Sequence, residues 1–204
     1  MDENKEVNST DPKREKVRVI PLSAINDAPD HPFGVRDDDE MAELVESIST
    51  FGVINPVIVR KGEGERYELI SGHRRKYACA KLCIDTLPVI VRDLSREEAI
   101  IFMVDSNLQR EHILPSERAK AYKMKMEALK RQGLRTDLTS AQLAPKLTTE
   151  KIGEEAGVSK DTVKRFIRLT ELQPELQQMV DEKKMAFTPA VEISYLKPDE
   201  QKML

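Results

Sequence analysis

The segment LISGHRRKYACAK, residues 69–81, places residues that can bind an anion at the expected start of a helix. Gly72 follows an apolar run, and Arg74 and Arg75 come shortly after it. A strand that leads through a glycine into a helix exposes unpaired N–H groups and lets a ligand come close. Arginine adds a full charge in a forked geometry that suits phosphate. The pattern therefore predicts a phosphate site, and the alternative is that the arginines pair with the acidic residues 37–40.

A second stretch, DSNLQREHI at residues 105–113, has polar residues in a segment that should be packed. Ser95 and Glu98 have the spacing of a capping box, so a helix is expected from there to about Arg110. The side chain of Asn107 can ligate a metal ion or bind phosphate, and Arg110 can pair with an anion. Together the two stretches strengthen the prediction of an anion site.

A third pattern, TEKIGEEAGVSKDTVKRFIRL at residues 149–169, fits a helix-turn-helix. Gly153 provides the small residue where two helices cross, Gly157 the sharp turn, and Val163 the apolar anchor of the second helix. Ile152, Val158 and Ile167 complete the expected buried set. Ser159 can cap the second helix. The residues left to contact bases or phosphates of DNA are Ser159, Lys160, Asp161, Thr162, Lys164, Arg165 and Arg168.

Charge is distributed unevenly along the chain, although its formal net charge is only −3. Residues 1–58 carry 13 acidic and 6 basic residues, whereas residues 118–168 carry 13 basic and 6 acidic ones. A basic second half favours a polyanionic partner such as double-stranded DNA. The alternative is an ordinary pair of helices with a solvated basic face.

The composition indicates a soluble, helix-rich protein, with 39% hydrophobic and 34% charged residues and no tryptophan. No apolar run approaches the ~20 residues of a membrane helix, and the N-terminus lacks the apolar segment of a signal peptide. We therefore expect a cytoplasmic protein with no membrane partner, and the predicted DNA binding would make it nucleoid-associated. Cys79 and Cys83 lie four residues apart in a helical pattern, which predicts two core-facing residues and no zinc site.

The periodicity predicts an α+β domain followed by an all-helical domain. We expect a disordered tail at residues 1–15, a mixed domain at 16–112 and a helix-turn-helix domain at 113–204. The strands are expected to start near residue 16 and to cover 53–60, 66–70 and 87–94, the middle two forming a hairpin. A loop is expected at residues 28–34. Helices are expected over residues 36–52, 73–82, 95–110 and 115–133, with several more beyond. Residues 134–147 read as a loop that contains a short helix.

The motifs resemble those of the ParB family of chromosome and plasmid partition proteins, which includes nucleoid-occlusion relatives. The family has a Gly-Glu-Arg-Arg box after a strand, where this chain has GHRR from Gly72 to Arg75. It has a Glu-Asn-Leu-Gln-Arg box, which SNLQR from Ser106 to Arg110 matches at four of five positions. An earlier arginine-containing box aligns loosely with HPFGVR, which ends at Arg36. The resemblance extends from residue 17 to about residue 200.

The resemblance implies a homodimeric DNA clamp that binds a palindromic centromere-like site and is switched by CTP. A partition ATPase of the ParA type is the further partner implied, in contact with the N-terminal tail. CTP with Mg²⁺ is expected in the N-terminal domain, with Asn107 as the metal ligand. The residues implied to bind nucleotide are Gly72, His73, Arg74, Arg75, Asn107, Gln109, Arg110 and Arg36.

The chain departs from the family boxes at two positions. His73 replaces a glutamate, and Ser106 replaces an acid that helps to hold Mg²⁺, so the chain is expected to be at most a slow CTP hydrolase. The departures also favour an alternative, a DNA-binding transcription regulator on the same scaffold that does not hydrolyse nucleotide. Family members usually continue into a dimerisation segment beyond the position of Leu204, so a truncated chain or a shortened relative is expected.

An enzyme is the remaining alternative. The expected N-terminal fold resembles that of sulfiredoxin, which uses ATP and has a cysteine just before a His-Arg pair. Gly72 occupies that position here, so the nucleophile is missing. A nuclease would need clustered acids to hold two metal ions, and the sequence has no such cluster.

Overall fold

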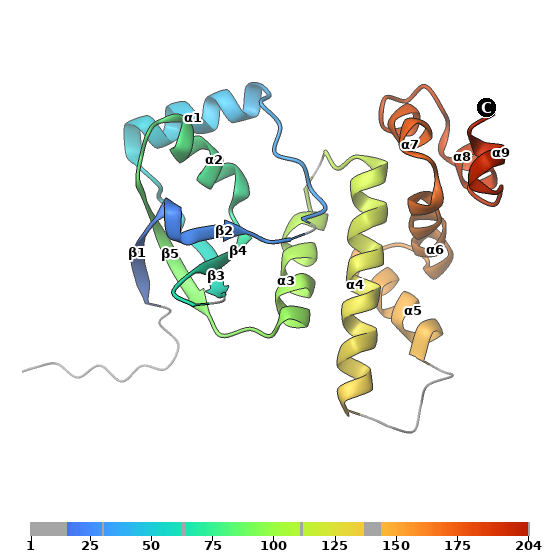
Figure 1. The fold of residues 1–204 in the computed structure, drawn as a ribbon, viewed down its shortest axis with the longest axis horizontal. Helices are drawn as coiled ribbons and strands as arrows, with labels where there is room; N and C mark the ends of the chain where they lie inside the picture. Colours follow the sequence, from blue (N-terminus) through green and yellow to red (C-terminus); the bar gives the residue numbers. More distant parts are fainter. Residues whose placement is uncertain (1–15, 30, 63, 111, 137–143, 204) are drawn as a thin grey trace, which may run out of the picture.

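The computed structural model in Figure 1 describes residues 16–29, 31–62, 64–110, 112–136 and 144–203. A curved sheet with three helices forms the N-terminal part, and helices alone form the rest. The predicted fold class is therefore confirmed. The expected disordered tail at residues 1–15 and half of the segment 134–147 lie outside the described residues.

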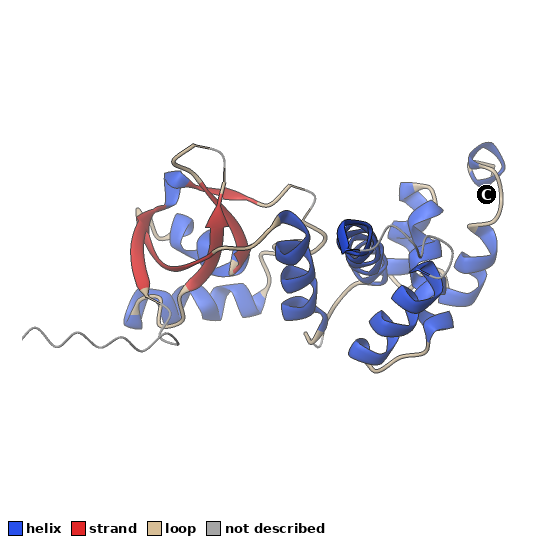
Figure 2. Cartoon of the chain, turned by 90° about the horizontal axis from the view of Figure 1, so that it is seen from below, coloured by secondary structure: helices blue, strands red, loops and turns tan. Residues whose placement is uncertain are grey.

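In the described part of the chain, five strands form one mixed sheet in the order β1-β5-β3-β4-β2. β3 pairs with β4 antiparallel, as the predicted hairpin requires, and with β5 parallel. β1 pairs antiparallel with β5 at one edge, and β2 pairs parallel with β4 at the other. Figure 2 shows that the sheet curls strongly. The strands are β1 (Val17–Pro21), β2 (Ile25–Asp27), β3 (Val57–Lys61), β4 (Tyr67–Ser71) and β5 (Thr86–Arg92).

Helices cover both faces of the sheet, and the alternation of β3 and β4 shows why. Leu69 and Ile70 are both fully buried although they point to opposite faces. Leu69 packs with residues of α1 (Asp39–Phe51) and α2 (His73–Lys81), whereas Ile70 packs with α3 (Arg96–Leu108). The two cores therefore hold α1 and α2 against one face of the sheet and α3 against the other.

Side-chain caps mark where two helices of the N-terminal part begin. The side chain of Asp38 accepts a hydrogen bond from Met41 N at 2.9 Å and so caps α1, which ends at Gly52 with a φ of 71°. Ser95 and Glu98 form the predicted capping box of α3. These local signals fix where each helix begins, because they satisfy N–H groups that have no partner within the helix.

The helical part is built around α4, which stands between α3 and the remaining helices (Figure 1). Among the described residues, no helix is both long and apolar enough to cross a membrane. The helices are α4 (Pro115–Thr136), α5 (Ala144–Ala156), α6 (Lys160–Arg168), α7 (Pro174–Asp181), α8 (Phe187–Ile193) and α9 (Pro198–Gln201).

The structure corrects four details of the sequence interpretation. β2 was not expected, because three residues are too short to show an alternating pattern. β3 begins at Val57 rather than at residue 53, since Pro56 has no N–H to donate to a neighbouring strand. α4 continues past Gly133 to Thr136. Cys79 is buried as expected, but Cys83 is exposed, because it follows α2 with a φ of 54° that turns the chain.

α5 and α6 form the predicted helix-turn-helix, and both glycines have the expected roles. A Cβ on Gly153 would lie 2.6 Å from Val158 O, so only glycine permits this crossing. Gly157 makes the turn with a φ of 66°. Ile152 and Val163 are fully buried, and Val158 and Ile167 pack beside them. Tyr122 of α4 completes this core.

We predict that Gly153→Ala destabilises the protein by about 1–3 kcal/mol, because the new Cβ would press on backbone atoms that cannot rotate away. Gly133→Ala is the matched control: its Cβ would meet none of the described atoms within 4 Å. That change should stabilise the protein by about 0.5–1 kcal/mol, since alanine favours a helix. Urea unfolding followed by circular dichroism measures both. Equal free energies of unfolding for the two variants would contradict the crossing constraint.

Candidate functional site

A pocket of about 440 Å³ lies where the N-terminal part meets the start of α4. Its walls come from residues 33–40, the first turn of α2, the segment between α3 and α4, and the first turn of α4. Four of the eight residues predicted to bind nucleotide line it: Arg36, Arg74, Gln109 and Arg110. The other four, Gly72, His73, Arg75 and Asn107, do not line it and lie on the same elements.

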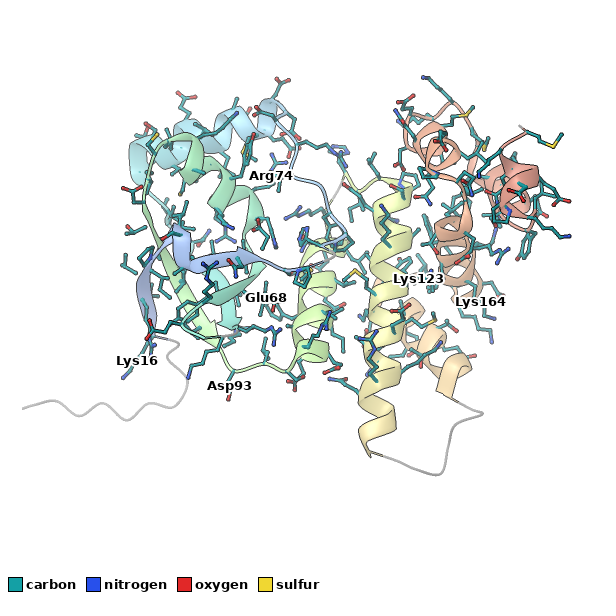
Figure 3. The ribbon with its side chains drawn as sticks, in the orientation of Figure 1. Lys16, Glu68, Arg74, Asp93, Lys123 and Lys164 are labelled. Atoms are coloured by element: carbon teal, nitrogen blue, oxygen red, sulfur yellow. The ribbon has the colours of Figure 1, made fainter. Side chains whose placement is uncertain are left out.

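Arg74 is held at the pocket by acids of the same chain. Its guanidinium donates to both carboxylate oxygens of Asp38, at 2.9 and 3.3 Å, and lies 3.5 Å from Glu40. Figure 3 shows Arg74 between α2 and the segment that leads into α1. The hydrogen bond from Arg74 lowers the pKa of the Asp38 carboxyl. The alternative that these arginines pair with residues 37–40 is therefore confirmed for Arg74, and it is wrong for Arg75.

Arg36 reaches across the pocket to α4. Its Nη2 lies 2.8 Å from Glu117 Oε1, and the same oxygen accepts from Gly34 N at 2.9 Å. The second carboxylate oxygen of Glu117 accepts from Leu114 N at 3.1 Å. One carboxylate thus joins the loop before α1 to the first turn of α4. The sequence interpretation missed Glu117, because nothing local indicates a partner about eighty residues away.

Gly72 and Arg75 build the turn from β4 into α2. Gly72 has a φ of 110°, and a Cβ there would lie 2.5 Å from Val57 Cγ1. The guanidinium of Arg75 donates to the carbonyls of Asn55 and Pro56, at 2.5 and 2.8 Å. Arg75 therefore ties α2 to the segment before β3, and its charge lies behind the pocket wall.

Three arginines gather around this turn. Burial lowers the pKa of Arg110, and the charge of Arg74 lowers it further, although Glu117 and Glu40 act in the opposite direction. Burial also lowers the pKa of Arg75, and the charge of Arg110 adds to that effect. Like charges this close destabilise one another, so an anion between them would be stabilised.

Asn107 is 3% exposed near the end of α3. Its amide nitrogen donates to Met103 O at 2.7 Å, and its Oδ1 has no hydrogen-bond partner among the described residues. A buried amide oxygen of this kind suits a cation ligand. Ser106, in contrast, donates its hydroxyl back to Met103 O at 3.0 Å. The described residues contain no group of three or more acidic, histidine or cysteine side chains that could hold a metal.

His73 packs against His31, a residue that the sequence interpretation did not select. The two ring centroids lie 3.6 Å apart. His31 Nδ1 donates to Phe33 O at 2.7 Å, and neither Nε2 has a partner among the described residues. Burial lowers the pKa of His73 to about 3, helped by the neighbouring His31. An uncharged imidazole therefore stands where the family has a glutamate.

The predicted DNA-contacting residues lie on α6 and at its N-terminus. Ser159 caps α6 by accepting from Thr162 N at 3.1 Å, as expected. Lys160 lies 2.7 Å from Glu150 of α5, and Lys164 lies 3.3 Å from Asp161. Ser159, Asp161, Lys164 and Arg165 are exposed, and Lys160, Thr162 and Arg168 are half-buried. Figure 3 shows Lys164 pointing away from α4.

Arg165 and Arg168 both contact the far end of the chain. Arg165 Nη2 donates to Thr188 Oγ1 at 2.8 Å. Arg168 donates to the hydroxyl and the carbonyl of Ser194, at 3.1 and 2.5 Å, and its guanidinium lies 4.3 Å from the ring centroid of Tyr195. Arg168 thus attaches α6 to the end of α8. Sequence periodicity could not reveal these contacts, because they join residues more than twenty positions apart.

We predict that the buried imidazole of His73 makes stability depend on pH. Its pKa is lowered from 6.5 to about 3, so the unfolded chain binds a proton that the folded chain does not. The free energy of unfolding should therefore be highest above pH 6.5 and fall as the pH is lowered. His73→Gln should flatten this dependence between about pH 3 and pH 6.5, the interval between the two pKa values of His73. Parallel curves for wild type and His73→Gln would contradict the assignment.

Two family models match this chain over nearly its whole length. The family model described as the ParB N-terminal domain matches residues 6–108, and the model described as the ParB HTH domain matches residues 111–204. The nucleoid occlusion protein of Geobacillus thermodenitrificans is 31% identical over 191 residues, which is 94% of this chain and 62% of that protein. That of Lysinibacillus sphaericus is 33% identical over 172 residues, covering 84% and 52%. The chain thus spans little more than half the length of these relatives.

Solved structures show the same fold. ParB of Caulobacter crescentus, C-terminally truncated and complexed to the centromeric parS site, has a TM-score of 0.55 and 24% identity over 88% of this chain and 86% of that one. A Pnob8-like ParB-N domain has a TM-score of 0.63 and 16% identity over 92% and 87%. The two family models together cover nearly all of the sequence, and they follow one another in the order of the sheet part and the helix-turn-helix part of this chain. The chain belongs to the ParB family of DNA-binding partition and nucleoid-occlusion proteins.

Proposed function

We propose that this protein binds a palindromic, centromere-like DNA site and that CTP in its N-terminal half converts it into a DNA clamp. The observation that carries the proposal is the pocket at the domain junction. It brings Arg36, Arg74 and Arg110, which are far apart in the sequence, to one place beside the first turn of α4. The same α4 packs against the helix-turn-helix. A ligand in this pocket would therefore touch the helix that supports the DNA-reading unit.

The volume of the pocket and its three arginines support a nucleoside triphosphate as the ligand. About 440 Å³ is within the range typical of small-molecule sites, which is roughly 300–1,000 Å³. Forked guanidinium groups suit phosphate oxygens, and Gln109 adds a polar side chain to the wall. The geometry supports a polyphosphate, and the family resemblance supports CTP in particular. Gly72, His73 and Arg75 would shape the turn beneath it.

Asn107 is the residue that would hold Mg²⁺, through its unpartnered Oδ1. When bound, the metal would neutralise phosphate charge, and the phosphates and water would supply the remaining ligands. Ser106 has a hydroxyl instead of the carboxylate that the family has at this position, and this hydroxyl donates to the α3 backbone. It therefore supplies no acidic ligand beside Asn107. We therefore propose that the chain binds CTP and hydrolyses it slowly at most.

DNA binding is proposed through α6 and its N-terminal cap. A single helix-turn-helix reads one half-site, so a palindromic target implies a second copy of the chain. The two relatives described above are nucleoid occlusion proteins, which supports a place on the nucleoid. A ParA-type ATPase remains a proposed partner of the N-terminal tail.

A second candidate function is a transcription regulator that binds no nucleotide. The observation that favours it is the pairing of the pocket arginines within the chain. Arg74 pairs with Asp38 and Glu40, and Arg36 pairs with Glu117, so both already have partners. The uncharged His73 in place of glutamate points the same way. Nucleotide binding separates the two functions.

We predict that calorimetry with CTP, ATP, GTP and UTP, each with and without Mg²⁺, shows binding that favours CTP. Arg74→Ala should weaken CTP binding by at least about tenfold, which corresponds to about 1.4 kcal/mol. The loss is expected because a charge-assisted contact to phosphate disappears. Lys76→Ala is the matched control, because Lys76 lies on the same helix and pairs with Asp27 outside the pocket.

Equal losses for Arg74→Ala and Lys76→Ala would place the phosphates elsewhere. A wild-type protein that binds none of the four nucleotides, even with DNA present, would establish the regulator in place of the clamp.

We predict that Lys164→Ala weakens binding to double-stranded DNA and leaves the melting temperature unchanged, because Lys164 is exposed on α6. If it contacts a phosphate, the slope of log affinity against log salt should fall by about one. Arg168→Ala should instead lower the melting temperature, since Arg168 holds Ser194 and Tyr195. Fluorescence anisotropy with duplexes selected from a random pool by the wild-type protein measures the affinities.

The selected duplexes should share a two-fold symmetric sequence if two copies bind together. An unchanged affinity for Lys164→Ala at every salt concentration would remove that residue from the DNA-contacting face.

A further inference from the structure

Lys125, in the middle of α4, is a charged residue in the core of the protein. Its side chain is only 1% exposed. The ammonium contacts Asp105 of α3 and lies 2.5 Å from Glu155 Oε2 of α5. A buried ammonium without a carboxylate partner is strongly unfavourable, so both contacts constrain the helices that supply them.

These three residues connect parts of the chain with different proposed roles. Asp105 belongs to α3, which carries Asn107 near its end and leads directly into Gln109 and Arg110 of the pocket, and Glu155 belongs to the first helix of the helix-turn-helix. Both helices pack against α4, and Lys125 reaches from α4 to each of them. A shift of α3 relative to α5 would therefore separate the ammonium from one carboxylate.

The surroundings of the cluster leave room for such a shift. Asp105 and Glu155 are 47% and 42% exposed, and both line an open pocket of about 440 Å³ between α3, α4 and α5. The ammonium is enclosed on its α4 side, whereas its partners can exchange protein contacts for water. The cost of separation thus falls on the lysine, which cannot follow either carboxylate into solvent.

We propose that Lys125 is the positioning residue that links the nucleotide pocket to the helix-turn-helix. Its two ion pairs hold α3, α4 and α5 as one unit, so an anion that reorganises the end of α3 also changes the position of α5. The inference rests on the proposed function, since it needs both a nucleotide and a DNA ligand. By thermodynamic reciprocity, DNA must change nucleotide affinity by the same factor as nucleotide changes DNA affinity.

The experiment measures CTP affinity of the full chain by calorimetry, with and without saturating selected DNA. In the wild type we expect the two affinities to differ by at least about fivefold. In Lys125→Met, each ligand alone should bind within about threefold of wild type. The ratio of the CTP affinities measured with and without DNA should, however, approach one. A residue with only a structural role would shift the melting temperature and leave the ratio unchanged. Lys130→Met, on the same helix, is the matched control and should keep the wild-type ratio.

Removing the lysine leaves no uncompensated buried charge, so Lys125→Met is expected to fold. Asp105→Asn and Glu155→Gln are a second test, because each removes one ion pair and keeps the side-chain shape. Both variants should bring the ratio of CTP affinities with and without DNA closer to one. A wild-type ratio in Lys125→Met and in both of these variants would overturn the inference. So would a wild-type protein that binds CTP and DNA independently. A wild type that binds no CTP would overturn the proposed function and, with it, this inference.

Discussion

The carboxylate of Glu117 is the contact on which the junction of the two parts depends. It stands in the first turn of α4, where the helix dipole favours negative charge, and it accepts from Gly34 N, Arg36 and Leu114 N. Those donors come from the loop before α1 and from the entry to α4 itself. One side chain therefore sets the wall of the pocket, the position of Arg36 and the direction in which α4 leaves the N-terminal part. Because α5 and α6 pack against α4, the direction of α4 also determines where the helix-turn-helix lies.

Ion pairs within the chain also determine the charge of the pocket. Asp38, Glu40 and Glu117 neutralise arginines that would otherwise repel one another at the turn into α2. An incoming triphosphate would have to take over these arginines and would also face the displaced carboxylates. The affinity for a nucleotide is then a difference between two sets of ion pairs rather than a sum of new ones. Binding and rearrangement of residues 33–40 would be a single event, which is the behaviour that a switch requires.

Sequence reasoning succeeded where the physical cause is local. The caps at Ser95 and Ser159 and the glycines of the helix-turn-helix act within a few residues, and the structure has each of them as expected. It also brought Arg36, Arg74, Gln109 and Arg110 together correctly. It failed for His31, Glu117 and Lys125, whose partners are distant along the chain. Sequence reasoning also could not predict that the Arg168 guanidinium donates its hydrogen bonds to Ser194. An arginine that is free to bind DNA and one that is bonded within the protein are the same letter in a sequence.

The exposed cysteine just beyond the end of α2 can be labelled selectively. The chain has two cysteines, and they differ sharply in access: Cys79 is fully buried with a raised thiol pKa, whereas Cys83 is exposed just beyond the helix. A thiol-reactive dye or spin label should therefore attach selectively at Cys83, in the unaltered protein. The label would sit at the opposite end of α2 from Gly72, away from the arginines of the pocket. Two labelled copies on one DNA molecule would report the separation of their N-terminal parts as an optical or magnetic-resonance distance.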